Sequence, residues 1–284
     1  MFTEQRQFIR ATLAGDRLLS PATVYDALSA RIAESVGFRL GIFAGSVCAA
    51  TEFAAPDIAL QTLTEFADQV RRFMRHSKLA LIVDADHGYG NALNVMRTVE
   101  ELEHAGAAVV TVEDLAMPRR FGAPHEFELV SVEEMSGKLR AAVAARRDPS
   151  LVIAARTAAL KGEDTARMVA RVRAYSKTGV DAIFITGLKK IADFEAARAA
   201  TTLPFIIGTA PEVAREELAA RGVRILLLGH PPVRAMAKTL RDVYTHLYNG
   251  GLPAELKDRL ASVQEMEVLL GDARHAEWTR EYLQ

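Results

Sequence analysis

The sequence predicts an α/β protein, a (β/α)₈ (TIM) barrel with extra C-terminal helices. Eight short apolar or β-branched runs alternate with longer amphipathic segments, which is the pattern of repeated βα units. A chain of 284 residues, of which 50% are hydrophobic, is long enough to fold such a barrel around one core. An open doubly wound sheet is the alternative, because spacing along the chain does not determine the order of the strands.

The elements follow in a regular order after a first helical segment over Thr3–Ala14. Glycine follows the periodic segments at Gly37, Gly179 and Gly222, which is typical of helix ends. The eight predicted strands are Leu18–Val24, Leu40–Ala44, Leu79–Val83, Ala108–Val112, Leu151–Ala155, Asp181–Ile185, Pro204–Ile207 and Arg224–Leu228.

Residues 81–106 have the clearest pattern of strand, loop and helix. An apolar run ends at Asp84 and Asp86, a glycine-containing loop follows, and a 3.6-residue apolar period then begins. Asn91 is a suitable N-cap for this helix, and Gly106 is suitable for its C-terminal end. The two acids therefore lie at the carboxyl end of a buried strand, where parallel α/β proteins bind ligands.

The chain divides at the end of the eighth βα unit. A helix over Val233–Tyr248 completes the predicted barrel domain, residues 1–249. A break over 249–253 precedes a helical extension, residues 250–284, which contains no further strand. We expect this extension to make contacts in an oligomer, and the alternative is that it covers its own barrel.

Composition excludes several kinds of partner. Lys and Arg number 35 against 36 Asp and Glu, so the chain lacks the broad positive field that nucleic acid or an anionic membrane surface needs. The one cysteine, Cys48, has no internal partner for a disulfide, and the N-terminal residues do not resemble a secretion signal. No apolar stretch approaches the roughly 20 residues of a membrane span. We expect a cytoplasmic protein that acts on a small molecule.

Acidic residues gather where the third and fourth predicted strands end. Asp84 and Asp86 follow strand three, Glu113 and Asp114 follow strand four, and Asp57 lies in the long connection after strand two. Carboxylates around one opening repel each other unless a cation lies among them. Oxygen ligands favour Mg²⁺, with Mn²⁺ as the alternative. These acids could instead cap the following helices, which is the role we predict for Asp114.

Other polar residues at strand ends are suited to binding an acid substrate. Arg156 ends the fifth strand and could hold a carboxylate through two hydrogen bonds, or it could pair with one of the acids. Gly45 and Ser46 offer an N–H and a hydroxyl after strand two, although such a pair is often only a turn. His230 ends strand eight and is the histidine we predict to take part in chemistry.

Four motifs occur together in the order of a known family. They are Gly45-Ser46, Asp84-Ala-Asp-His-Gly-Tyr-Gly-Asn, Val112-Glu113-Asp114 and Ala155-Arg156-Thr157. In this combination the chain resembles the isocitrate lyase/phosphoenolpyruvate mutase superfamily, and is most similar to its Mg²⁺-dependent oxaloacetate decarboxylase branch.

This resemblance implies a (β/α)₈ barrel with a helix exchanged between neighbouring subunits of a homotetramer. It also implies a metal site in which Asp86 binds Mg²⁺ directly and three further acids hold its waters. These water-binding acids would be Asp57, Asp84 and Glu113.

The sequence departs from this family at three places. Carbon–carbon lyases of the superfamily have a thiol in the loop after strand four, where this chain has Arg119-Arg120-Phe121-Gly122-Ala123. Cys48 lies elsewhere and is predicted to be a small core residue. Ala158 stands where the family has Asn or Asp, and Thr209-Ala210 stands where the decarboxylases present a tyrosine.

The activity implied is Mg²⁺-dependent decarboxylation of oxaloacetate, or of a closely related β-keto acid, to pyruvate and CO₂. In this hypothesis Gly45, Ser46 and Arg156 bind the carboxylate end of the substrate, and the metal and Arg156 stabilise the enolate. His230 orients the substrate, hydrogen-bonds the enolate or protonates carbon. The alternatives are a carbon–carbon lyase or a phosphonopyruvate-type hydrolase of the same superfamily, and a barrel that binds ligands without catalysis.

Overall fold

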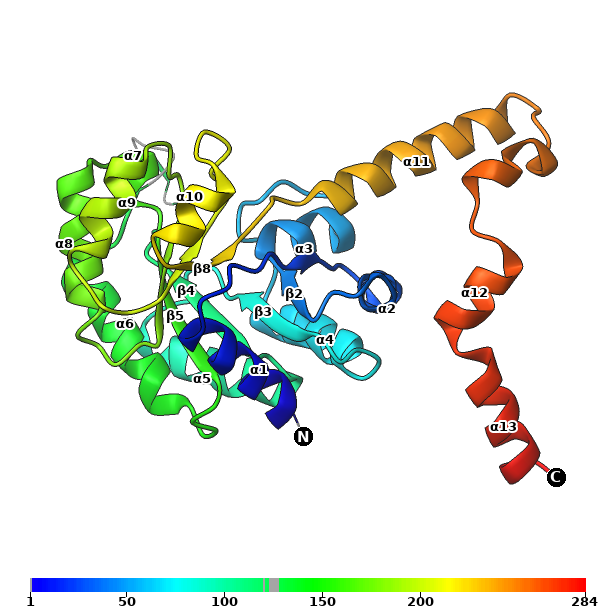
Figure 1. The fold of residues 1–284 in the computed structure, drawn as a ribbon, viewed down its shortest axis with the longest axis horizontal. Helices are drawn as coiled ribbons and strands as arrows, with labels where there is room; N and C mark the ends of the chain where they lie inside the picture. The colour runs from blue at the N-terminus through cyan, green and yellow to red at the C-terminus, as the bar shows by residue number, and fades with distance from the viewer. Residues whose placement is uncertain (1, 120, 123–127) are drawn as a thin grey trace.

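The computed structural model describes residues 2–119, 121–122 and 128–284 (Figure 1). One sheet of eight parallel strands runs in the order β1 to β8. The sheet closes because Leu19 N donates to Arg224 O over 2.9 Å and Leu226 N donates to Leu19 O over 3.0 Å. The strands are β1 (Ala22–Thr23), β2 (Leu40–Phe43), β3 (Ala80–Asp84), β4 (Val109–Glu113), β5 (Val152–Thr157), β6 (Ala182–Ile185), β7 (Phe205–Ile207) and β8 (Val223–Leu226).

Helices surround this closed sheet and also extend beyond it (Figure 1). The first seven are α1 (Thr3–Ala14), α2 (Ala27–Val36), α3 (Gly45–Glu52), α4 (Leu63–Met74), α5 (Ala92–Ala105), α6 (Val132–Ala145) and α7 (Ala159–Gly162). The others are α8 (Thr165–Tyr175), α9 (Ile191–Arg198), α10 (Arg215–Ala220), α11 (Pro231–Tyr248), the 3₁₀ helix η1 (Pro253–Arg259), α12 (Val263–Leu270) and α13 (Asp272–Tyr282).

The structure confirms the predicted barrel and its strand–loop–helix unit. Asn91 caps α5 by accepting hydrogen bonds from Leu93 N and Asn94 N, and Gly106 ends the same helix at φ 110°. The predicted first strand is too long, because only Ala22 and Thr23 pair as β1. Pro21, which precedes them, has no N–H to donate to a sheet.

The core consists of two apolar clusters. Their positions show which end of the barrel is open. Apolar side chains inside the barrel, such as Ile82 and Phe184, pack with Ile9 and Leu13 of α1. Helix α1 therefore covers the amino ends of the strands. A second cluster, which includes Phe66 of α4 and Val99 of α5, fills the layer between strands and helices. The carboxyl ends of the strands are left for a ligand site, as in other barrels of this type.

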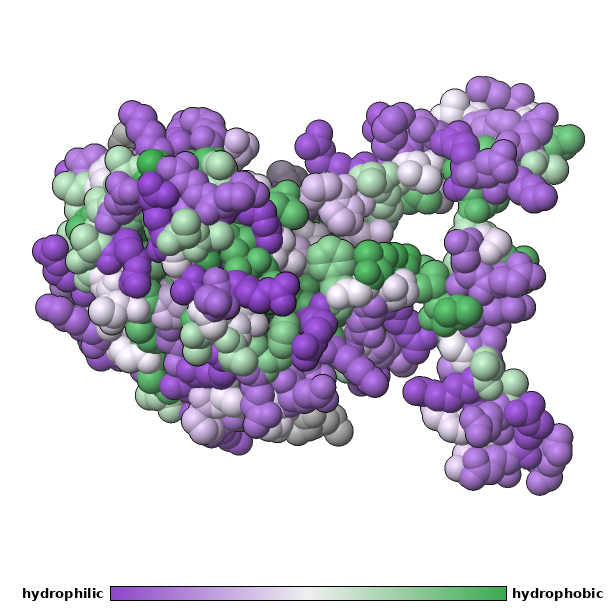
Figure 2. All heavy atoms as spheres, in the orientation of Figure 1, coloured by the Kyte–Doolittle hydropathy of each residue, from purple (hydrophilic) through white to green (hydrophobic). Residues whose placement is uncertain are grey.

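The C-terminal helices form an arm that leaves the barrel (Figure 1). None of the residues of α11, α12 or α13, all of which the structure describes, is buried. Arg31 of α2 donates to Leu269 O over 2.7 Å, so α12 contacts its own barrel at α2. Figure 2 shows apolar surface over α2, beside the gap between barrel and arm. Among the described residues, no helix combines the length and apolar character needed to span a membrane.

Candidate active site

The carboxyl ends of the strands surround a pocket of about 370 Å³. Its lining brings together residues from eight separate segments of the chain. Seven predicted site residues line it, namely Ser46, Asp57, Asp84, Asp86, Glu113, Arg156 and His230. The convergence that the sequence predicts is therefore confirmed, whereas the role of each residue stays a prediction.

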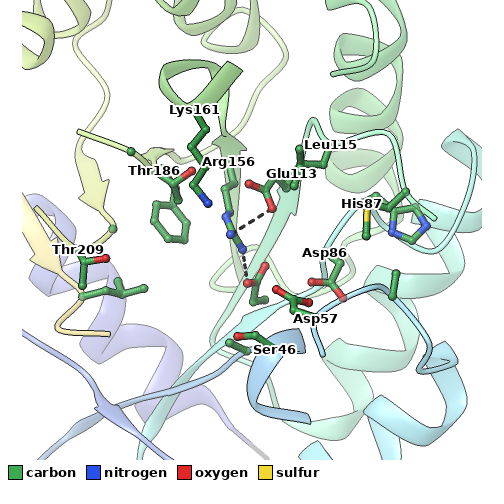
Figure 3. A pocket seen from close by; sticks show the side chains of 18 of the residues that line it. Ser46, Asp57, Asp86, His87, Glu113, Leu115, Arg156, Lys161, Thr186 and Thr209 are labelled. Carbon is green, nitrogen blue, oxygen red and sulfur yellow. Dashed lines mark hydrogen bonds and ion pairs between the residues drawn. The ribbon is translucent and has the colours of Figure 1, made fainter. Parts of the chain in front are cut away.

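Arg156 pairs with two acids from neighbouring strands. Its Nη1 donates to Asp84 Oδ2, and its Nη2 lies 3.1 Å from Glu113 Oε2 (Figure 3). Burial alone would lower the pKa of Arg156, but the charges of Asp84 and Glu113 outweigh burial and raise it. One fixed cation is thus already present among the pocket acids, which the sequence left as an alternative role for Arg156.

Asp86 is held in an unusual backbone conformation by contacts on two sides. Its φ of 47° lies in the left-handed region, and its carbonyl oxygen accepts from Glu113 N over 2.7 Å. Its Oδ2 accepts from Gln61 Nε2 over 2.9 Å. A Cβ atom placed on Gly45 would lie 2.4 Å from both carboxylate oxygens, so only glycine there leaves room for this carboxylate.

The remaining acids share one electrostatic environment with Asp86. Figure 3 shows the carboxylates of Asp57 and Asp86 pointing toward one another. Burial, then the charges of Asp84 and Asp57, raises the pKa of Asp86. Burial and Asp84 likewise raise the pKa of Asp57. Burial raises the pKa of Glu113 to about 7 against the opposing charge of Arg156. The negative charges of these acids are therefore only partly balanced by Arg156, which favours the binding of a further cation.

The residues present fit a hard divalent ion. All the acidic ligands are oxygen donors, and Glu113 Oε1 is buried without a hydrogen-bond partner among the described residues. In the described part of the chain, no three acidic, histidine or cysteine side chains lie close enough to hold one ion together. An ion here would therefore take few direct protein ligands and complete its shell with water or substrate, as Mg²⁺ usually does.

Gly45 and Ser46 form the first turn of a helix rather than an isolated turn. Helix α3 begins at Gly45, and Ser46 lines the pocket. The first amides of a helix have no partner within it, and the helix dipole favours an anion at this end. The local geometry is thus suited to binding a carboxylate next to Asp86.

His230 lines the pocket and directly precedes α11. Its Nδ1 lies 3.0 Å from the hydroxyl oxygen of Thr23, on β1. Burial lowers the pKa of His230, with Arg156 adding to that effect and Asp84 opposing it. The imidazole is therefore neutral near pH 7.

The predicted capping role of Asp114 is wrong. Asp114 does not cap the following helix, since Ser131 caps α6. It is fully buried and instead accepts from Thr157 Oγ1, Ala158 N and Tyr175 Oη, over 2.7, 3.0 and 2.9 Å. Ala158 is buried and donates its amide to Asp114, and it is not among the described residues that line the pocket.

The segment after β4 adds an arginine to the rim. Arg119 lines the pocket, whereas the side chain of Phe121 is fully exposed and does not cover it. Arg120 and Ala123 of the predicted loop lie outside the described residues.

Cys48 is a buried free cysteine, and burial raises the pKa of its thiol to about 12, which confirms the prediction that it is a core residue.

Sequence reasoning missed several polar contributors to the site, among them Gln61, Thr23, Lys161 and Thr186. Gln61 and Thr23 contact predicted residues from the connection after α3 and from β1. Lys161 and Thr186 line the pocket beyond Arg156 (Figure 3). Lys161 follows the strand that carries Arg156 by only a few residues, so its position after a strand was the available signal. Gln61 and Thr23 gave no such signal.

Residues 10–248 match the model of a family described as Phosphoenolpyruvate phosphomutase. The chain belongs to this family. The match confirms the superfamily that the four motifs indicate, and it spans the whole barrel and α11.

Two relatives are similar to this member of the family over nearly its whole length. The oxaloacetate decarboxylase of Bradyrhizobium diazoefficiens is 48% identical over 265 residues, 93% of this chain and 91% of the relative. That of Bradyrhizobium sp. strain BTAi1 is 45% identical over 285 residues, 100% of this chain and 98% of the relative.

Solved structures of the family share the fold. A phosphonopyruvate hydrolase complex with oxalate and Mg²⁺ superposes with a TM-score of 0.88 at 31% identity, covering 99% of each chain. An oxaloacetate acetylhydrolase in complex with oxalate superposes with a TM-score of 0.84 at 28% identity, covering 97% of each chain. The first of these neighbours binds a divalent metal with a small dicarboxylate.

Proposed function

We propose that this protein is a carboxy-lyase that decarboxylates oxaloacetate, or a closely related β-keto acid, to pyruvate and CO₂ with the help of Mg²⁺. The observation that carries the proposal is the placement of Arg156 against Asp84 and Glu113, beside Asp86, in one pocket. This arrangement provides a cation site and a fixed guanidinium side by side. The names of the two relatives and the oxalate complexes support the same reaction class.

The metal would be held by Asp86 directly and by Asp57, Asp84 and Glu113 through water. Mn²⁺ has the same preference for oxygen ligands and is the alternative ion. When bound, the ion supplies Lewis-acid stabilisation of negative charge on a substrate oxygen. The chain's own contribution is to fix the position of the Asp86 carboxylate through Gln61 and Gly45.

The other pocket residues would bind and orient the acid. The first turn of α3, at Gly45 and Ser46, and the guanidinium of Arg156 provide donors for a carboxylate. Loss of CO₂ moves negative charge onto the C2 oxygen, and the buried positive charge of Arg156 stabilises that charge more than the neutral ketone. No side-chain nucleophile is required, which agrees with the absence of a thiol from Arg119–Ala123.

Turnover of a panel of acids tests this proposal against its competitors. Purified protein with Mg²⁺ would be incubated with oxaloacetate, substituted malates and phosphonopyruvate, with the rate of Mg²⁺ alone subtracted. We expect pyruvate to form from oxaloacetate, and Asp86→Asn to abolish both metal binding and turnover. Asp16→Asn, an exposed acid at the other end of the barrel, should change neither.

Three outcomes would reject the decarboxylase. Cleavage of a substituted malate with oxaloacetate untouched would identify a carbon–carbon lyase, and phosphate release would identify a phosphonopyruvate-type hydrolase. Binding of metal and oxalate without turnover of any acid would identify a ligand-binding barrel.

The arm formed by α11 to α13 supports a homotetramer in which a helix is exchanged between neighbouring barrels. Leu256 of η1 is buried, but α11, α12 and α13 bury none of their residues, so an isolated arm leaves apolar surface in water. A second copy of the chain would cover that surface through the extension, residues 250–284, together with α11. We further propose that the enzyme acts in the cytoplasm on a small keto acid.

A further inference from the structure

His230 shares its Nδ1 atom with a threonine that lies behind it. Oγ1 of Thr23 lies 3.0 Å from His230 Nδ1 and 3.0 Å from the carbonyl oxygen of Gly229. Thr23 is buried, at 6% exposure, whereas His230 lines the pocket. The orientation of the ring therefore depends on a side chain outside the pocket lining.

The hydroxyl of Thr23 has a single proton for these two neighbours. The carbonyl of Gly229 can only accept a hydrogen bond, so the Thr23 proton satisfies it. The lone pairs of the same oxygen then remain for His230, which must donate through an Nδ1–H. If the ring instead carried its proton on Nε2, the Thr23 hydroxyl would have to donate to Nδ1. Its oxygen would then face the carbonyl oxygen of Gly229 as a second acceptor, and that carbonyl would lose its hydrogen bond.

The helix that follows does not compete for the imidazole. His230 precedes α11, whose first two residues are Pro231 and Pro232. A capping side chain accepts from the second or third amide of a helix, and proline has no N–H, so only the amide of Val233 could bind His230 here. The His230 side chain makes no cap hydrogen bond, which leaves the contact with Thr23 to determine its tautomer.

We propose that Thr23 is a positioning residue that holds His230 as the tautomer protonated on Nδ1, with Nε2 as a hydrogen-bond acceptor in the pocket. The catalytic meaning of this tautomer rests on the proposed function, but the tautomer itself does not. The charged side chains that act on the ring are Asp57, Asp84 and Arg156, and burial keeps the ring neutral against the two acids.

This tautomer narrows the roles open to His230. A neutral ring without a proton on Nε2 cannot donate to an enolate oxygen and cannot protonate carbon. It can accept a hydrogen bond from a water molecule or from a substrate hydroxyl, such as that of an enol. The new C–H bond then takes its proton from water, and the hydroxide that remains is neutralised by the buffer.

Solid-state ¹⁵N NMR of histidine-labelled protein tests the proposal directly. The His230 signals are identified by their loss in His230→Gln. We expect a protonated Nδ1 and an unprotonated Nε2 in the full-length protein at pH 7, with and without Mg²⁺. Thr23→Val should shift the ring toward the Nε2–H form, and Thr23→Ser should restore the original pattern. The loss of one hydrogen bond should lower kcat/KM about tenfold in Thr23→Val, mainly through kcat.

A matched control separates positioning from a general loss of stability. Thr178 is also buried, and its hydroxyl donates to Tyr175 O over 2.7 Å, on the outer layer of the barrel. Thr178→Val should leave the His230 signals and kcat/KM unchanged. A protonated Nε2 in the unmodified protein, or an unchanged tautomer in Thr23→Val, would overturn the proposal. The predicted tautomer in a protein that turns over no keto acid would instead reject only the proposed function.

Discussion

Gly45 lies directly against the carboxylate of Asp86. A Cβ atom on Gly45 would stand 2.4 Å from both oxygens of that carboxylate, closer than any nonbonded contact allows. The two residues come from different βα units, so the start of α3 and the loop after β3 are shaped to each other. The fit leaves the Asp86 carboxylate one position, which Gln61 then holds through Oδ2.

Gly45→Ala should therefore displace the carboxylate of Asp86, the proposed metal ligand, without unfolding the barrel. Gly45 is the first residue of α3, where alanine fits the backbone well, so the clash is confined to Asp86. We expect Mg²⁺ affinity and kcat/KM to fall about 10- to 100-fold, as for other changes that disturb the support of a ligand. Isothermal titration with Mn²⁺ and steady-state kinetics would measure both.

Gly137→Ala is the control for this substitution. Gly137 lies in the interior of α6, where an added Cβ approaches only Arg140 Nη2, at 4.0 Å. Alanine should raise helix stability by up to about 1 kcal/mol and leave metal binding unchanged. If Gly45→Ala and Gly137→Ala bind metal with the same affinity, the close approach of Gly45 to Asp86 does not affect metal binding.

Glu113 should make the metal-free protein less stable as the pH rises. Its pKa is raised by burial to about 7, above the value of about 4.3 expected for an unfolded chain. Between these values the folded protein holds a proton that the unfolded chain has lost, so the free energy of unfolding falls as pH increases. The decrease from Glu113 should be on the order of a few kcal/mol, complete above the folded pKa.

Urea unfolding from about pH 4 to pH 8 would measure this slope in the protein and in Glu113→Gln. The other pocket acids titrate in both, so the difference between the two proteins reports the titration of Glu113 together with its effect on those acids. We expect that difference to change across the interval, and Mg²⁺ to restore stability at the high end. A difference that stays constant with pH would contradict the assigned pKa.

The sequence located the pocket through strand ends alone. Asp84 and Glu113 are the last residues of β3 and β4, and in a closed parallel barrel such residues meet at one rim whatever the details of packing. Arg156 was identified by the same reasoning. The (β/α)₈ fold follows from the same alternation of apolar runs and amphipathic segments.

Contacts across the fold were beyond this reasoning. Gln61 reaches Asp86 from a connection without regular structure, and nothing in its neighbours along the chain marks it. The predicted capping role of Asp114 assumed that its carboxylate accepts hydrogen bonds from the amides of the next helix in the sequence. Its partners come instead from β5 and α8, 43 and 61 residues away. Such pairings depend on how layers pack, which a linear pattern does not contain.

The buried partners of Asp114 should contribute measurable stability. Tyr175 Oη donates to Asp114 Oδ2 over 2.9 Å and accepts from Arg171 Nη1 over 3.0 Å. Tyr175→Phe removes both bonds in a fully buried position, so we expect a loss of about 1–3 kcal/mol in the free energy of unfolding. Urea denaturation would measure it. A Tyr175→Phe variant as stable as the unmodified protein would contradict the prediction.

The arm formed by α11 to α13 should hold the subunits of the oligomer together. Leu240, Tyr244 and Leu247 recur at spacings of four and three residues on α11 and are 42%, 64% and 41% exposed, which makes one apolar stripe. Placing two charges on that stripe with Leu240→Glu and Tyr244→Glu should bury unpaired carboxylates at any interface there and prevent association.

Sedimentation velocity would show the effect as a change from an assembly to a single chain of 31.0 kDa. Lys238→Glu is the control, since Lys238 pairs with Asp242 on the exposed side of the same helix at 3.1 Å. It should alter the local ion pair and leave the assembly intact. A monomeric unmodified protein would contradict the tetramer, and an intact assembly in the double variant would move the interface away from α11.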